Sequence, residues 1–218
     1  MKKLILGIIS AALCVTALVS MTGCSKINGN KDNDPVQTVS GQVKYDDYIF
    51  VGDSRFVGMK EAVDGSSDAD VKFVAEVGQG LAWLKRTAPS LYGESGKTII
   101  FNLGVNDLYN VSGYIDFYNG MPQDFIENNT LVIMTVNPVD EEKGGEFGYS
   151  VTNSEIEDFN KTLISGLDNL YFKVIDSYTY LKMSAFKTVD GIHYNNDTYR
   201  LIFDYAIECC GNQGFMKR

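Results

Sequence analysis

The chain has 218 residues, of which 44% are hydrophobic and 22% charged, and this composition suits one domain with a full core. The formal net charge of −9 makes the surface repel phosphate backbones, so nucleic acid is excluded as an expected partner. A single histidine, His193, excludes a histidine-rich metal site, and no cysteine spacing is typical of zinc.

The first 23 residues have the pattern of a targeting segment. Lys2 and Lys3 precede an apolar stretch over residues 4–19, which is shorter than the about 20 residues of a membrane-spanning helix. The small residues before Cys24 resemble a bacterial lipobox, in which the cysteine is lipidated. We therefore expect a signal peptide over residues 1–23 and an extracytoplasmic protein anchored to the bacterial cell membrane by lipid on Cys24. An ordinary secretory signal with a chance cysteine and an uncleaved membrane anchor are the alternatives.

The remaining chain divides into a tether and a domain. Residues 24–44 are polar and nearly free of bulky apolar side chains, which is typical of a linker. Residues 45–218 form the expected single domain. Near its end, Cys209 and Cys210 are adjacent in an apolar run. Two buried helix thiols are the favoured state of this pair, and a vicinal disulfide is the alternative.

Within the domain, short apolar runs alternate with helical patterns. Continuous or β-branched runs predict strands over residues 48–51, 71–77, 98–103, 131–136 and 171–175. Helical spacing predicts helices over residues 55–63, 80–87, 154–167 and 197–210. The alternation is typical of βαβ units, so we expect a three-layer α/β/α sandwich around a five-stranded, mainly parallel sheet.

Two features of the connections add detail. Ser154 is the predicted N-cap of the third helix, with Glu157 completing a capping box. Residues 109–129 and 138–153 exceed ordinary loop length. The second of these segments holds three glycines among acidic residues, and a mobile flap and a plain surface loop are its two interpretations.

Polar groups follow the predicted strands at the edge where open α/β sheets bind ligands. Four of them lie directly after successive strands, and two lie in the run Asp-Gly-Ile-His before the last helix. In chain order these groups are Ser54, Gly78, Asn106, Asn137, Asp190 and His193.

Three of these residues have the chemistry of a nucleophilic triad. A serine hydroxyl such as that of Ser54 is a weak nucleophile and needs a base in contact with it. His193 can take and return a proton near neutral pH, and Asp190, three residues earlier, can hold the other ring nitrogen. Acyl transfer also builds negative charge on a carbonyl oxygen, which the amides of Ser54, Gly78 and Asn106 are predicted to bind.

Together the blocks Gly-Asp-Ser, Gly78, Gly-Val-Asn-Asp and Asp-Gly-Ile-His resemble the SGNH hydrolases, also called the GDSL esterase and lipase family. The resemblance covers nearly the whole domain. It implies a flavodoxin-like sandwich with Ser54 as nucleophile, His193 as base and Asp190 as its orienter. It also implies that Gly78 and Asn106 complete the oxyanion hole, and it implies no metal or organic cofactor.

The sequence departs from this family at two places. Gly80 is available beside Gly78 for the second block, and we prefer Gly78 because it follows the strand. Arg55 follows the nucleophile where apolar residues are common in the family. Contact with an anionic substrate group and exposure to solvent are the two interpretations of Arg55.

Three further residues are candidates for contact with a substrate. Tyr109 and Tyr194 lie beside the motifs, and Asn137 follows the fourth strand, although a turn before Pro138 explains Asn137 equally well. The expected activity is hydrolysis of short-chain, acetyl esters, on a small molecule or on cell-wall or extracellular polysaccharide. An O-acyltransferase with the same triad and a lipid-anchored binding module without turnover are the alternatives.

Overall fold

A computed structural model describes residues 47–64 and 71–217. The predicted signal peptide 1–23, the lipidation site Cys24 and the tether 24–44 lie outside these residues. Within the described part, no helix combines the length and the apolar character needed to cross a membrane.

The centre of the domain is a sheet of five strands in the order β2-β1-β3-β4-β5, and every neighbouring pair is parallel. The strands are β1 (Tyr48–Gly52), β2 (Lys72–Ala75), β3 (Thr98–Asn102), β4 (Thr130–Met134) and β5 (Phe172–Ile175). The register places Gly52 beside both Ala75 and Asn102, so these three strands end at the same level. The predicted five-stranded sheet is confirmed, with all of its strands parallel and their bounds moved by one or two residues.

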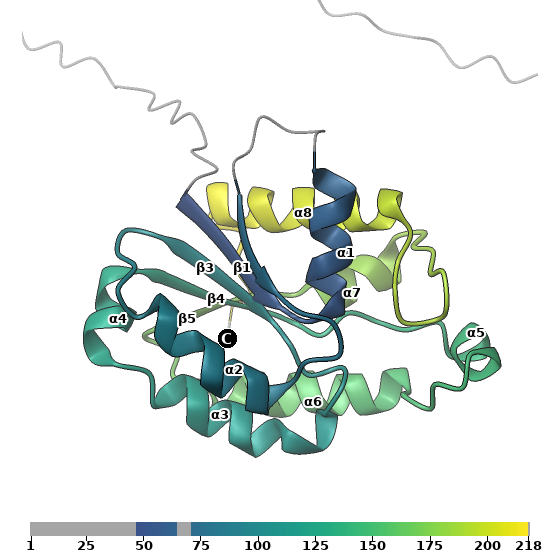
Figure 1. Cartoon of the computed structure of the whole chain (residues 1–218), viewed down its shortest axis with the longest axis horizontal. Helices are drawn as coiled ribbons and strands as arrows, with labels where there is room; N and C mark the ends of the chain where they lie inside the picture. Colours follow the sequence, from purple (N-terminus) through teal and green to yellow (C-terminus); the bar gives the residue numbers. More distant parts are fainter. Residues whose placement is uncertain (1–46, 65–70, 218) are drawn as a thin grey trace, which may run out of the picture. The chain divides into compact units, whose positions relative to one another are not determined.

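Helices cover both faces of this sheet (Figure 1). One face carries α1 (Ser54–Val63), α7 (Ser177–Met183) and α8 (Asn196–Gly211). The other face carries α2 (Leu81–Thr87), α3 (Val111–Asn119), α4 (Gln123–Asn128) and α6 (Asn153–Gly166). The predicted three-layer sandwich is confirmed.

Alternate side chains of each strand supply the two halves of the core, because successive residues of a strand point to opposite faces. Phe50 is fully buried against Phe56 of α1 and Phe203 of α8. Ile49 and Val51 belong to the opposite half, with α2, α3 and α6. Burial on both faces explains why these strands are nearly continuous apolar runs.

The start of α6 differs from the prediction. Its N-cap is Thr152, whose hydroxyl accepts the amide of Glu155 while the Glu155 carboxylate accepts the amide of Thr152. The capping pattern occurs twice in overlap, and the structure uses the first copy rather than Ser154 with Glu157. Glu157 instead accepts the hydroxyl of Tyr178 at 2.5 Å.

Both long connecting segments contain helices. Residues 109–129 include α3 and α4, and the α3 side chains Tyr114 and Tyr118 are buried in the core. Residues 138–153 include α5 (Glu141–Glu146) and are mostly exposed from residue 141 to residue 150, as a surface segment is. The interpretation of this segment as a mobile flap stays a prediction. Cys209 and Cys210 are free thiols in α8 (Asn196–Gly211), as favoured from the sequence, but only Cys209 is buried and Cys210 is partly exposed.

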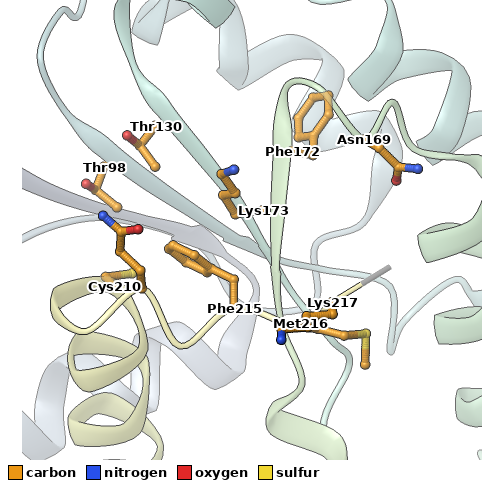
Figure 2. Close-up of a pocket in the computed structure, with 10 residues that line it drawn as sticks. Thr98, Thr130, Asn169, Phe172, Lys173, Cys210, Phe215, Met216 and Lys217 are labelled. Carbon is orange, nitrogen blue, oxygen red and sulfur yellow. The ribbon is translucent and has the colours of Figure 1, made fainter.

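A cavity of about 640 Å³ opens at the edge where the strands begin (Figure 2). Thr98, Thr130 and Phe172 line it from the first residues of β3, β4 and β5. The C-terminal tail forms another wall, and the amide of Met216 donates to the carbonyl of Val174 on β5. Within the described part of the chain, none of the predicted catalytic, oxyanion or substrate-contact residues lines this cavity.

Candidate active site

Ser54 is the first residue of α1, directly after the end of β1. Asp53, rather than Ser54, is the N-cap, and its Oδ1 accepts the amide of Arg55 at 2.9 Å. Gly52 allows the tight turn between strand and helix, since a Cβ there would lie 2.6 Å from the Phe56 ring and 2.8 Å from the Asn102 carbonyl. The turn therefore fixes the Ser54 hydroxyl at the sheet edge.

Ser54, His193 and Asp190 form a continuous hydrogen-bonded chain. The Ser54 Oγ lies 2.8 Å from Nε2 of His193, and Nδ1 of His193 lies 2.6 Å from Oδ2 of Asp190. The Ser54–His193 pair is separated by 139 positions in the sequence and is brought together by the fold. The imidazole is 31% exposed, which leaves one side of the chain open to a reactant.

Backbone amides fix the position of the Asp190 carboxylate. Its Oδ1 accepts the backbone amides of Ile192 at 3.0 Å and His193 at 2.7 Å. Burial raises the pKa of this carboxyl, but the hydrogen bonds from the ring and amide of His193 and the amide of Ile192 outweigh burial and lower the pKa below its ordinary value. Asp190 is thus ionised at neutral pH and oriented toward Nδ1.

The loop that carries Asp190 and His193 rests against the segment after β4. Gly191 has a φ of +94° and a Cβ there would lie 2.2 Å from the amide nitrogen of Gly144 in α5, so only glycine fits. The Gly191 carbonyl accepts the amide of Asp140, and Nζ of Lys143 donates to the carbonyl of Thr188. The segment that the sequence left open as a flap or surface loop therefore supports the acid–base loop.

The candidate oxyanion residue Asn106 connects the loop after β2 with Asp53, the residue before the nucleophile. The Asn106 side-chain amide donates to the Gln79 carbonyl at 2.8 Å and lies 3.5 Å from Oδ2 of Asp53. The second contact is long for a hydrogen bond, so that N–H remains available to another acceptor. Gly78, one residue before Gln79, is exposed, with a φ of +73° and open space around it.

Gly80 has a different environment from Gly78. A Cβ at Gly80 would lie 2.5 Å from the carboxylate of Asp107. That carboxylate accepts the amide of Leu81 at the start of α2 and the hydroxyl of Tyr114. Asp107 thus ties the start of α2 to the loop after β3. The arrangement favours Gly78 over Gly80 as the open backbone position.

Asp53 is a buried carboxyl beside the nucleophile. It is 1% exposed, and burial raises its pKa to about 6 against the opposing effects of the Arg55 charge and amide. Its contact with Asn106 also places it between the helix that carries Ser54 and the candidate oxyanion amide.

Three of the four predicted substrate contacts are buried. Arg55, Asn137 and Tyr194 are 2%, 1% and 3% exposed, so the interpretation of Arg55 as a solvent-exposed side chain is wrong. Contact between Arg55 and an anionic substrate group stays a prediction. The side chains pack beneath the triad instead of beside an open surface. Burial here arises from contacts between loops that are far apart in the sequence, which no local pattern signals.

Tyr109 is the exception, with 85% of its surface exposed. Four other large apolar side chains on the loops after the strands are also exposed, namely Val77, Phe147, Tyr149 and Val189. We call these five residues the apolar rim. Within the described part of the chain, no group of three or more His, Cys, Asp or Glu side chains is arranged to hold a metal ion.

No family model matches the chain, and no curated protein matches it. Solved structures match it in fold. A lipase/acylhydrolase from Enterococcus faecalis is 17% identical over 78% of this chain and 98% of that chain, with a TM-score of 0.55. A member of the lipolytic protein G-D-S-L family from Veillonella parvula is 20% identical over 74% and 96%, with a TM-score of 0.55.

A third match is the C-terminal catalytic domain of peptidoglycan O-acetyltransferase A from Streptococcus pneumoniae. It is 14% identical over 78% of this chain and 95% of that chain, with a TM-score of 0.54. At such identities the likeness establishes the fold. The chain therefore has the three-layer fold of the SGNH, or GDSL, hydrolases, as the sequence resemblance implied.

Proposed function

We propose that this protein is a serine esterase of the SGNH type. The observation that carries the proposal is the hydrogen-bonded chain from Ser54 through His193 to Asp190, with contacts of 2.8 and 2.6 Å. A serine in contact with an imidazole, which is in turn held by an ionised carboxylate, is the arrangement that activates a hydroxyl nucleophile. Its location at the carboxyl ends of the strands is where such sheets bind ligands.

The geometry supports a two-step reaction. Ser54 Oγ attacks the ester carbonyl carbon while its proton moves to Nε2 of His193, and Asp190 stabilises the resulting imidazolium. Collapse of the tetrahedral intermediate breaks the bond to the alcohol, which leaves with the proton from Nε2. Water then attacks the acyl-enzyme by the same route and releases the acid and free Ser54.

The negative charge on the carbonyl oxygen needs hydrogen-bond donors. The backbone amides of Ser54 and Gly78 and the side-chain amide of Asn106 are the proposed donors. Support comes from the open position of Gly78 and from the loosely held N–H of Asn106. Each such donor contributes roughly 10²–10³ in rate.

Acetyl esters on a cell-wall or extracellular polysaccharide are the proposed substrates. The apolar rim supports this class, since exposed Tyr109, Phe147 and Tyr149 offer ring faces for stacking against sugars. The fold likeness to a peptidoglycan O-acetyltransferase is consistent with it. The lipobox-like run before Cys24 supports an extracytoplasmic location with lipid anchorage, where such polymers occur.

Transfer of the acyl group to a sugar hydroxyl is the second candidate function. It uses the same acyl-enzyme, and only the acceptor differs between water and an alcohol. The fold likeness to peptidoglycan O-acetyltransferase A supports acyl transfer as a second candidate function. Assaying release of acetate against acetylation of an added sugar oligomer separates the two functions.

Hydrolysis of an activated acetate ester by the wild type and by Ser54→Ala tests the esterase proposal. We expect turnover by the wild type and a loss on the order of 10⁴-fold or more in Ser54→Ala, with the same circular dichroism spectrum. A serine-directed phosphonate should label the wild type at Ser54. Absence of both turnover and labelling in the wild type would reject the esterase and favour a non-catalytic binding module.

A further inference from the structure

Arg55 is a buried cation one residue after the nucleophile. Its side chain is 2% exposed, and its NH1 donates to the backbone carbonyl of Asn137 at 2.9 Å. Its guanidinium carbon also lies 5.4 Å from the ring centroid of Tyr194, which is within the range of a cation–π contact. One side chain thus reaches from the start of α1 to two other loops.

These two loops are the ones that hold the base of the triad. Tyr194 directly follows His193, and its hydroxyl donates to the carbonyl of Pro138. Asn137 and Pro138 begin the segment that supports the Asp190–His193 loop through Asp140 and α5. Arg55 therefore ties the helix that begins with Ser54 to the loop that ends with His193, beneath the reacting atoms.

Burying the Arg55 side chain costs free energy, so hydrophobic packing alone does not explain its position. Burial of a charge is unfavourable unless its donors are paired. Among the described residues, Nε and NH2 of Arg55 have no hydrogen-bond partner, and the same holds for Oδ1 of Asn137 and the hydroxyl of Tyr199. Local costs of this kind are expected at functional sites rather than in ordinary core.

We propose that Arg55 is a positioning residue whose planar guanidinium, bonded to Asn137 and stacked on Tyr194, sets the distance between Ser54 and His193. This inference rests on the proposed esterase function. Displacement of catalytic groups by about 1 Å can reduce the rate by about 10²-fold. Lysine keeps the charge but lacks the fork and the flat face, so it replaces arginine only in part.

Kinetics of two variants test the proposal. Arg55→Met keeps the length of the side chain without charge or donors, and we expect kcat on the activated acetate ester to fall roughly 10- to 100-fold with KM changed less than about threefold. Arg55→Lys should fall between Arg55→Met and the wild type. If Arg55→Met fails to fold, the same measurements on Arg55→Lys decide the question.

Arg200→Met is the control at a more exposed arginine, whose side chain is 44% exposed. Arg200 lies on α8 and its Nε donates to the carbonyl of Ala62 at 3.0 Å, which is also a bond from an arginine to a backbone carbonyl of a packed element. This contact with Ala62 lies at the end of α1 that is far from Ser54. We therefore expect Arg200→Met to change Tm and to keep kcat within about twofold of the wild type. A comparable loss of kcat in Arg200→Met would show that general destabilisation explains the effect.

The single histidine supplies a second readout that does not depend on turnover. Imidazole NMR signals of the protein all belong to His193, including the Nδ1 proton bonded to Asp190. We expect that proton signal to be lost or broadened in Arg55→Met and retained in Arg200→Met. If the signals and kcat are both unchanged in Arg55→Met, the proposed role of Arg55 is overturned. If the wild type is inactive and unlabelled but the signals are still altered in Arg55→Met, only the esterase proposal is overturned.

Discussion

Asp53 combines two roles at one position, as the helix cap that accepts the Arg55 amide and as neighbour of Asn106. Its raised pKa gives the first prediction. The folded state holds the Asp53 proton up to a pKa of about 6, compared with 3.8 as the ordinary value. The stability from this group is therefore full below about pH 4 and is lost as the pH rises through about 6.

Asp53→Asn isolates this effect, because asparagine is also a good N-cap. Between pH 4 and 6 we expect the free energy of unfolding of the wild type to decrease, relative to that of the variant, by about 2 kcal/mol. Urea unfolding at a series of pH values measures the difference. Asp190, whose lowered pKa acts below pH 4, is common to both proteins and cancels. Parallel curves would contradict the buried, neutralisable state of Asp53.

Asp190→Asn gives the second prediction at this scale. The amide cannot hold the imidazole in the tautomer that accepts the Ser54 proton, so we expect kcat to fall by about 10⁴-fold. The activated acetate ester serves as substrate, and the His193 NMR signals report the tautomer. A decrease smaller than tenfold would remove Asp190 from the orienting role.

The sequence predicted the residues of the candidate site better than their surroundings. Ser54 was found because it lies in a short run at a strand end, and parallel strands bring their ends to one edge. Asp190 and His193 were found because they lie three residues apart in the run before the last helix. Arg55, Asn137 and Tyr194 were assigned to the substrate because they adjoin those runs. Their burial depends on how three distant loops pack, which neither composition nor periodicity encodes.

At the scale of elements, the start of α6 provides a direct comparison of two candidate caps. Thr152→Ala removes the side chain that accepts the Glu155 amide, and we expect a loss of about 1 kcal/mol in the free energy of unfolding. Ser154→Ala changes an exposed residue already inside the helix and should cost less than about 0.5 kcal/mol. Urea unfolding of both variants measures the costs, and equal costs would favour the start predicted from sequence.

The strands were predictable because burial on both faces makes them apolar throughout, and only their ends moved. The short helices α4 and α5 were not predictable from the sequence. α4 and α5 have six residues each, which is too short for the apolar repeat of a helix to appear. α5 is fixed largely by what it touches, including Gly191 beside the triad.

At the scale of the whole molecule, the apolar rim distinguishes a polymer substrate from a small one. Tyr109→Ala removes its most exposed ring, and we expect kcat/KM on an acetylated polysaccharide to fall roughly fivefold, or about 1 kcal/mol. The activated acetate ester should be hydrolysed at the wild-type rate. Leu170→Ala is the control, since Leu170 is 79% exposed but precedes β5 at the opposite edge. Equal losses on both substrates would exclude a sugar-binding role for the rim.

The cavity edge in Figure 2 is also the edge at which the described domain begins and ends, with Tyr48 at the start of β1 and Lys217 in the cavity wall. Ser54 and His193 lie at the other edge of the sheet. A molecule fixed through Lys217 of the cavity wall to a bead or a sensor chip thus presents Ser54 and His193 to the solution. Immobilised enzyme should therefore act on polymers too large to diffuse beneath it.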